Sequence, residues 1–166
     1  MLRVEKGVQT VNVISLVTPK AHVAYLYDDF TIRQGLEKLR VHGYTAIPVL
    51  TREGQYVGTV SEGDFLWQIL DQKDNSLRAQ EKQPLKRILR RGFNPAVRID
   101  VTMGELLERA MRQSFIPVVD DRGAFVGIVT RQTILRRLTR PNVEGEETGS
   151  TCYMVTPACQ ERITER

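Results

Sequence analysis

The sequence predicts a mixed α+β fold in which one strand–helix–strand–strand–helix unit occurs twice. Three observations lead to this prediction. Two segments match each other in register, each follows a helix-capping signal at nearly the same distance, and each contains two short apolar strands. The 166-residue chain is long enough for a packed core. Neither unit alone could bury its apolar face, so we expect the two to pack together.

Residues 48–61 and 117–130 align without a gap. Both begin Pro-Val, continue to a turn glycine (Gly54 or Gly123), and then contain the pattern Val-Gly-x-Val. Ser61 in the first copy corresponds to Thr130 in the second. Because the capping signals upstream match as well, the similarity indicates an internal repeat and not chance.

The first half of the first unit contains a short opening segment, a strand and a helix. Val13–Val17 is the opening segment, and residues 22–27 alternate between apolar and polar, which predicts a strand. Thr31 and Gln34 have the spacing of a capping box, and apolar residues then recur along one helical face as far as Gly43. We therefore expect a helix that ends with this glycine as its C-cap.

The second half of the first unit contains a hairpin and another helix. Residues 46–50 and 56–60 are short apolar strands, and Gly54 lies at the turn between them. A helix follows from Ser61, its expected N-cap, to Leu70.

The second unit has the same order. Residues 84–89 open it, and Thr102 and Glu105 form the second predicted capping box, followed by helical residues Leu106, Leu107, Ala110 and Met111. Strands are expected at 116–119 and 125–129, with a turn at 121–123. A helix is expected at 130–138, with Thr130 as its N-cap.

We expect residues 1–83 to hold the first repeat and residues 84–141 the second. Polar residues 71–83 would join the two repeats, and residues 142–166 would form an acidic linker and tail.

Three features carry a resemblance to a known family: Tyr44–Val49, the stretch Gly58–Asp64, and the in-register duplication. Over roughly residues 12–140 the chain resembles the tandem cystathionine-β-synthase (CBS) domain pair, or Bateman module. Its segments 21–23, 43–50 and 130–131 are similar to those of small stand-alone CBS proteins that bind cyclic di-AMP. The resemblance implies two repeats packed pseudo-symmetrically, a disc-like homodimer, and adenosine-containing ligands in clefts between the repeats.

The resemblance also implies the residues of two clefts. The first would combine Lys20, Ala21, His22, Tyr44, Thr45 and Ala46 with Thr130, Arg131 and Thr133. The second would combine Asn94, Pro95, Ser114, Phe115 and Ile116 with Ser61 and Asp64. Apolar walls for an adenine ring would come from Ala46–Pro48 and from Phe115–Pro117.

The two clefts differ in chemistry. Asp64 suits the hydroxyls of a ribose, whereas Thr133 occupies the place where the family often has that aspartate. Arg131 and Lys20 instead suit phosphate, which favours cyclic di-AMP in the first cleft, with AMP, ADP or ATP bound through Asp64 as the competing interpretation. Structural roles remain open: Asp64 as a helix-start acid, Arg131 as a solvated residue, and Tyr44 as core filling.

Composition bounds the remaining alternatives. A net charge of +4 and a pI near 9.3 favour anionic partners only weakly. No apolar run approaches the roughly 20 residues of a membrane span, and no secretory signal is visible, so we expect a cytoplasmic protein whose Cys152 and Cys159 are incidental. No nucleophile motif, phosphate loop or metal-ligand spacing is present, so we expect neither an enzyme nor a required cofactor.

Two rival functions stay open: a constitutive interaction module without ligand, and a DNA-associated regulator acting through the arginine-rich faces. The sequence names neither the protein target nor the direction of regulation.

Overall fold

The structure is a computed structural model that describes residues 13–71, 81, 83–90 and 92–139. The predicted linker and tail at 142–166, both cysteines, and most of the predicted connection between the repeats lie outside the described residues. Within the described part of the chain, no helix is both long enough and apolar enough to cross a membrane.

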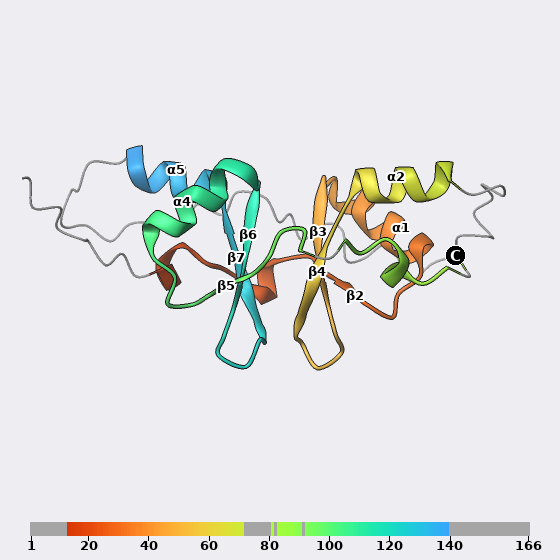
Figure 1. The fold of residues 1–166 in the computed structure, drawn as a ribbon, viewed down its shortest axis with the longest axis horizontal. Helices are drawn as coiled ribbons and strands as arrows, with labels where there is room; N and C mark the ends of the chain where they lie inside the picture. Colours follow the sequence, from red (N-terminus) through yellow and green to blue (C-terminus); the bar gives the residue numbers. More distant parts are fainter. Residues whose placement is uncertain (1–12, 72–80, 82, 91, 140–166) are drawn as a thin grey trace, which may run out of the picture.

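The predicted unit occurs twice, so the fold prediction is confirmed (Figure 1). The first repeat contains η1 (Val13–Leu16), β1 (Thr18–Pro19), η2 (Lys20–His22), β2 (Leu26–Tyr27), α1 (Ile32–His42), β3 (Ala46–Leu50), β4 (Tyr56–Ser61) and α2 (Glu62–Leu70). The second contains η3 (Leu85–Arg87), β5 (Val97–Arg98), α4 (Met103–Arg112), β6 (Phe115–Val119), β7 (Phe125–Thr130) and α5 (Arg131–Thr139).

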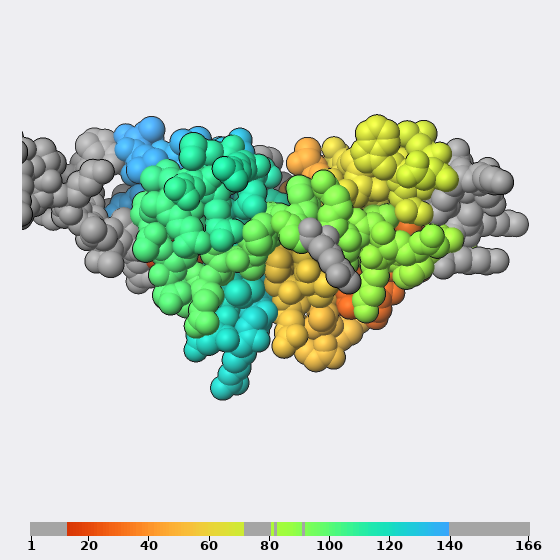
Figure 2. Space-filling model, viewed as in Figure 1, coloured from red at the N-terminus to blue at the C-terminus, as the bar shows by residue number. Residues whose placement is uncertain are grey.

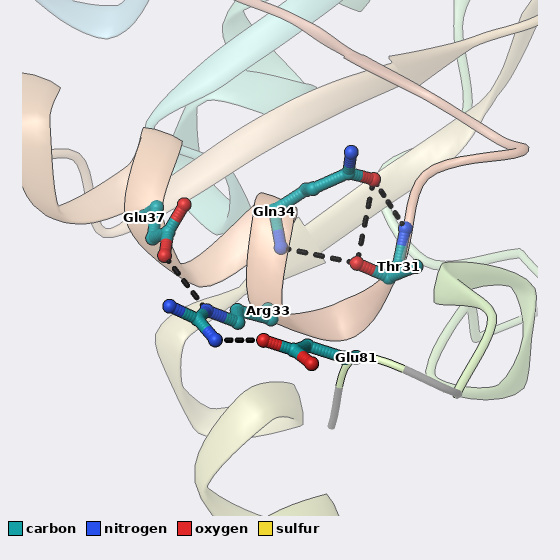
Figure 3. A network of polar contacts seen from close by, with 5 residues as sticks. All are labelled: Thr31, Arg33, Gln34, Glu37 and Glu81. Carbon is teal, nitrogen blue, oxygen red and sulfur yellow. Dashed lines mark hydrogen bonds and ion pairs between the residues drawn. The ribbon is translucent and has the colours of Figure 1, made fainter. Parts of the chain in front are cut away.

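Local signals position α1 as predicted. Thr31 and Gln34 form both hydrogen bonds of the capping box, and Gly43 ends the helix in the left-handed conformation with φ 63°. Figure 3 shows this capping box beside Arg33, which pairs with Glu37 and with Glu81. The helix start is therefore fixed by its own sequence.

The second predicted capping box forms only in part. Thr102 accepts a hydrogen bond from the backbone N–H of Glu105, as expected at the start of α4. The Glu105 carboxylate instead accepts from Arg109, 3.0 Å away and one turn later. An arginine within reach at the i+4 position draws the carboxylate along the helix.

Each repeat contributes one mixed sheet. In one sheet β2 runs parallel to β3, which is antiparallel to β4; the other has the order β1-β7-β6-β5. The predicted strand at residues 22–27 was wrong in extent, because only Leu26–Tyr27 is a strand and His22 lies in η2. The chain passes here from β1 in one sheet to β2 in the other, so its first part cannot pair continuously.

The opening segments are exchanged between the repeats. Val13 and Leu16 of η1 are buried in the core of the second repeat, and β1 pairs antiparallel with β7. Leu85 and Ile88 are buried in the core of the first repeat. Each core is therefore completed by residues that precede the other repeat in the sequence.

The two hairpins meet side by side, as Figure 1 shows. The rings of Tyr56 and Phe125, at the starts of β4 and β7, stack with centroids 6.1 Å apart. The backbone of Tyr56 donates to Gly123, and that of Phe125 donates to Gly54. This contact places equivalent strands of the two repeats next to each other and gives the pair its pseudo-twofold arrangement.

Candidate functional site

The opening segment of the second repeat lies against β4 and the start of α2. Asp64 is buried, and its Oδ2 accepts hydrogen bonds from the backbone N–H of Ser61 (2.8 Å) and from the Ser61 hydroxyl (2.7 Å). Its Oδ1 lies 2.7 Å from Nε of Arg90. The Arg90 guanidinium in turn lies 3.8 Å from the centroid of the Phe93 ring. The carboxylate predicted to bind ribose is therefore engaged by a helix start and by a cation.

A ring of hydrogen bonds holds the same segment to β4. The Tyr56 hydroxyl donates to the backbone carbonyl of Asn94 (2.7 Å), and it lies 2.8 Å from the hydroxyl of Thr59. Asn94 Nδ2 donates to Thr59 Oγ1 at 3.3 Å. Tyrosine has only one hydroxyl proton, and Tyr56 gives it to Asn94, so Thr59 must donate to Tyr56. The three hydrogen bonds therefore all donate in the same sense around the closed set. Asn94 adopts φ 54°, a left-handed conformation that asparagine tolerates better than most residues.

Because Tyr56 belongs to this set of hydrogen bonds, we expect the free energy of unfolding to fall at alkaline pH. Burial raises the pKa of Tyr56 to about 12, above the ordinary tyrosine value of about 10. The protonated form is favoured in the folded protein, so its contribution to stability is present below pH 10 and is lost between about pH 10 and 12. A shift of this size corresponds to roughly 2–3 kcal/mol.

Urea unfolding at pH 9 and at pH 11.5 tests this expectation in the wild type and in Tyr56→Phe. The variant retains the ring stacked on Phe125 but cannot titrate. Its stability should therefore fall less between the two pH values than that of the wild type. Equal losses in both proteins would show that Tyr56 is not the group responsible.

At the first predicted cleft, η2 packs against β7. The Lys20 ammonium lies 5.4 Å from the centroid of the Tyr25 ring, beside the turn at Gly54. Arg131, at the other end of β7, donates from Nε to the backbone carbonyl of Gln113 at 3.2 Å. Because β1 is antiparallel to β7, residues after Pro19 run toward the beginning of β7. The structure thus places Lys20 and Arg131 at opposite ends of this strand and not beside each other.

A pair of hydroxyls opens α5 where a carboxylate opens α2. The side chains of Thr130 and Thr133 lie 2.8 Å apart, and the backbone N–H of Thr133 donates to Thr130, confirming Thr130 as the N-cap. Pro19 and Arg90 each lie seven residues before the first residue of β2 or β5. The first repeat thus has proline where the second has the arginine that binds Asp64. The two predicted clefts therefore differ by the Arg90–Asp64 ion pair.

Each strand start lies beside the helix start of its own repeat. Ala46 pairs with Ser61, and the backbone of Glu62 donates to Thr45. In the second repeat Phe115 pairs with Thr130, and the backbone of Arg131 donates to Ser114. The grouping of each strand start with the helix start of the other repeat stays a prediction.

The remaining predicted residues divide between surface and core. Ala21, His22, Thr45, Pro95 and Ser114 are exposed, whereas Pro48 and Ile116 are buried within the sheets. The Tyr44 ring stacks on His42 with centroids 5.4 Å apart and packs against the core of the first repeat. That position favours the core-filling interpretation of Tyr44.

Sequence reasoning missed Arg90, which lies in the basic stretch of residues 86–91. Its partner Asp64 lies 26 residues earlier, so no local spacing could have paired them. Lys86, in the same basic stretch, binds Asp28 at 2.8 Å. Among the described residues, no three His, Cys, Asp or Glu side chains gather in a group that could hold a metal ion.

Comparison with known proteins agrees with the repeat. The family model for the CBS domain matches residues 13–71 and again residues 85–140. A CBS domain protein from Streptococcus pneumoniae is 30% identical, with a TM-score of 0.70 over 75% of this chain and 84% of that one. The comparison with curated proteins found no match.

Two further solved structures contain nucleotides. CbpB of Listeria monocytogenes, in complex with cyclic di-AMP, is 23% identical, with a TM-score of 0.70 over 77% of this chain and 95% of that one. CBSX2 of Arabidopsis thaliana, in complex with AMP, is 21% identical, with a TM-score of 0.63 over 76% and 95%. At these identities the likeness shows the fold.

The two matches to one family model coincide with the two repeats of the fold and together span most of the chain. The chain therefore belongs to the CBS-domain family, as a tandem pair of CBS domains.

Proposed function

We propose that this CBS pair is a regulatory sensor that binds an adenine nucleotide between its repeats, without chemistry on it, and passes the signal to a protein partner. We propose cyclic di-AMP as the ligand and the first cleft as its site. The observation that carries this choice is the contrast between the two helix starts: Asp64 is engaged by Arg90, whereas Thr130 and Thr133 form a neutral pair.

The first cleft offers groups suited to a phosphate. Arg131 is the first residue of α5, and its side chain is exposed. The N-terminus of a helix presents backbone N–H groups and a positive dipole end to an anion. His22 is exposed on η2, which packs against the strand that leads to this helix. Cationic and N–H donors of this kind bind phosphate oxygens well.

Binding of AMP, ADP or ATP through Asp64 is the competing proposal. A ribose at this carboxylate would have to displace Arg90, whose Nε lies 2.7 Å from Oδ1. Asp64 is buried whereas Arg90 is half-exposed, so displacement of the arginine would leave a buried carboxylate whose charge the ligand must satisfy. This cost favours the first cleft.

Thermal unfolding with a ligand panel tests the proposed function. The panel contains cyclic di-AMP, cyclic di-GMP, AMP, ADP, ATP and S-adenosylmethionine. A ligand at about 100 times its Kd should stabilise the fold by about 2.7 kcal/mol. We expect cyclic di-AMP to raise Tm and cyclic di-GMP to leave it unchanged. No shift with any adenine ligand would contradict the sensor.

Arg131→Ala should weaken cyclic di-AMP binding by roughly 1.5–3 kcal/mol, the cost of a lost hydrogen bond from a charged group. Isothermal titration calorimetry provides the measurement. The matched variant Asp64→Asn changes the other helix start and should leave this affinity unchanged. The opposite pattern, with Asp64→Asn alone weakening binding, would assign the ligand to the second cleft.

The rival function, a constitutive interaction module, is favoured by the exposed apolar side chains on α2 and α5. We propose that these helices form a homodimer in either case. Partner binding that changes when nucleotide is added would support the sensor, because coupling requires different ligand affinities in two states. Partner binding that ignores nucleotide would support the module.

A further inference from the structure

Three aromatic rings form a row at the edge of the first repeat. Strand β2 is the edge strand of its sheet, and the rings of Tyr25 and Tyr27 meet edge to face with centroids 5.5 Å apart. The Phe30 centroid lies a further 5.5 Å from that of Tyr27. In Figure 1, β2 lies on the side of this repeat away from α2, and Figure 2 shows the red-orange segment around it at the surface. All three rings are half-buried, so the row is partly open to solvent.

The planar cation of Arg52 lies on this row. Its Cζ is 4.1 Å from the centroid of Tyr27 and 5.6 Å from that of Phe30. An ion pair with Asp29, 2.9 Å from Nε, holds the guanidinium in place. The Arg52 side chain is 57% exposed, so the face turned away from the rings is open. A guanidinium held flat in this way offers a platform on which another planar ring can stack.

A second flat platform lies at the end of α1. The His42 ring is exposed and stacks on the half-buried ring of Tyr44, with only 15° between the two planes. Partial burial and the nearby charge of Lys38 lower the pKa of His42, so its ring is uncharged at neutral pH. The core of the first repeat supports Tyr44 from below, and the histidine is therefore presented on a fixed base.

Two lysines lie between the platforms. Lys38 lies on α1 one turn before the stacked histidine, and its ammonium is 5.4 Å from the centroid of Tyr25. Lys20 approaches the same ring at the same distance. Neither lysine forms an ion pair within the described part of the chain. The nearby carboxylate of Asp28 is already paired with Lys86, so positive charge is left in excess here.

The second repeat folds without these side chains. None of the three rings has an aromatic counterpart there, and an acid replaces Arg52. The corresponding positions hold Ala96, Arg98, Val101 and Asp121. Arg109 corresponds to Lys38 but pairs with Glu105, whereas the first repeat has Gln34 in place of that glutamate. The fold therefore requires neither the row nor the unpaired lysines.

We infer that this surface binds single-stranded nucleic acid, with bases stacked on Arg52 and His42 and the phosphates between them held by Lys38 and Lys20. Every base has a flat face, and lysines suit the backbone, so such a surface takes a strand with little regard to sequence. A duplex keeps its bases stacked on one another and cannot offer them to the platforms. An acidic polypeptide would satisfy the lysines but leave the platforms empty. Arg52, His42 and Lys38 all lie outside the two predicted clefts, so the inference does not depend on the nucleotide proposed there.

Fluorescence anisotropy tests the binding. The probes are fluorescein-labelled oligo(dT) and oligo(U) strands of about 12 nucleotides, within the range of single-strand binding sites. They contain no adenine, so the adenine clefts do not compete for them. We expect both strands to bind at low salt and a duplex of the same length to bind at least about tenfold more weakly.

Variants of one platform separate stacking from charge. Arg52→Ala and Arg52→Lys should each raise the Kd by about fivefold or more, because lysine keeps the charge but not the planar cation. His42→Ala should have an effect of similar size. The matched control Arg98→Ala removes one exposed arginine from the corresponding edge of the second repeat and should change the Kd by less than about twofold. Thermal unfolding of each variant checks that the fold is intact.

The contrary outcomes are distinct. Full affinity in Arg52→Lys would show a surface that acts by charge alone, and equal losses in Arg52→Ala and Arg98→Ala would show that binding is not confined to this surface. Equal affinity for the duplex would remove the stacked bases from the inference. Displacement of the strand by an equal concentration of polyglutamate of matched charge would assign the surface to acidic polypeptides. No anisotropy change with either strand would overturn the inference as a whole.

Discussion

Gly127→Ala is expected to lower the free energy of unfolding by about 3 kcal/mol, at the upper end of typical overpacking costs. A Cβ built at this position would lie 2.1 Å from the backbone carbonyl oxygen of Thr18. That oxygen belongs to β1, and β7 is held on its other side by β6. Neither strand can move away without breaking a ladder, so the substitution should detach β1 from the sheet.

The repeat supplies a matched control at Gly58, the equivalent position in the first repeat. Its Cβ would lie 3.1 Å from Cδ2 of Leu89, the end of a side chain that can shift. Gly58→Ala should therefore lower the free energy of unfolding by about 1 kcal/mol or less. Gly104→Ala, within α4 and open to solvent, should stabilise by roughly 0.5–1 kcal/mol. Denaturant unfolding of all three checks the order; equal costs at Gly127 and Gly58 would show that β1 is free to shift.

Leu85→Ala is expected to destabilise the protein by about 2–5 kcal/mol. Leu85 is fully buried although it lies in the opening segment of the second repeat, and its methyl group lies beside Gly35 and Phe65 of the first. Removal of three carbons leaves a cavity between α1 and α2, which are packed around it. Met111→Ala, at an exposed position on α4, should change stability by less than about 0.5 kcal/mol.

Hydrogen exchange gives Leu85→Ala a second readout. Because Leu85 completes the core of the first repeat, amides of β3 and β4 should lose more protection than those of β6 and β7. Greater loss in β6 and β7 would contradict the exchange of opening segments. A cost as small as that of Met111→Ala would show that the core closes without Leu85.

Features fixed by neighbouring residues could be predicted from the sequence. Gly43, Gly54 and Gly123 all have positive φ, at the helix end and the two turns where they were expected. The hairpin strands and the helices after them also agree closely with their predicted bounds. Capping, turn chemistry and apolar periodicity act over a few residues, so they can be recognised without the fold.

Features that depend on distant pairing could not be predicted. Apolar Val13 and Leu16 indicate burial, but nothing in their spacing names the core that receives them. The separation of Lys20 from Arg131 follows from the pairing of β1 with β7, more than a hundred residues apart in sequence. The Arg90–Asp64 pair likewise required the opening segment of one repeat to reach the helix of the other.

The exchanged opening segments make the chain resemble a domain-swapped dimer whose two subunits have been joined end to end. A fragment that ends before Pro84 would lack the residues that fill its own core, while its Val13 and Leu16 would have no core to enter. We expect such a fragment to be unstable alone and to be rescued when the complementary fragment is supplied in trans. A single repeat of this design could complete its core only by pairing with a second copy, and the continuous chain makes that pairing intramolecular.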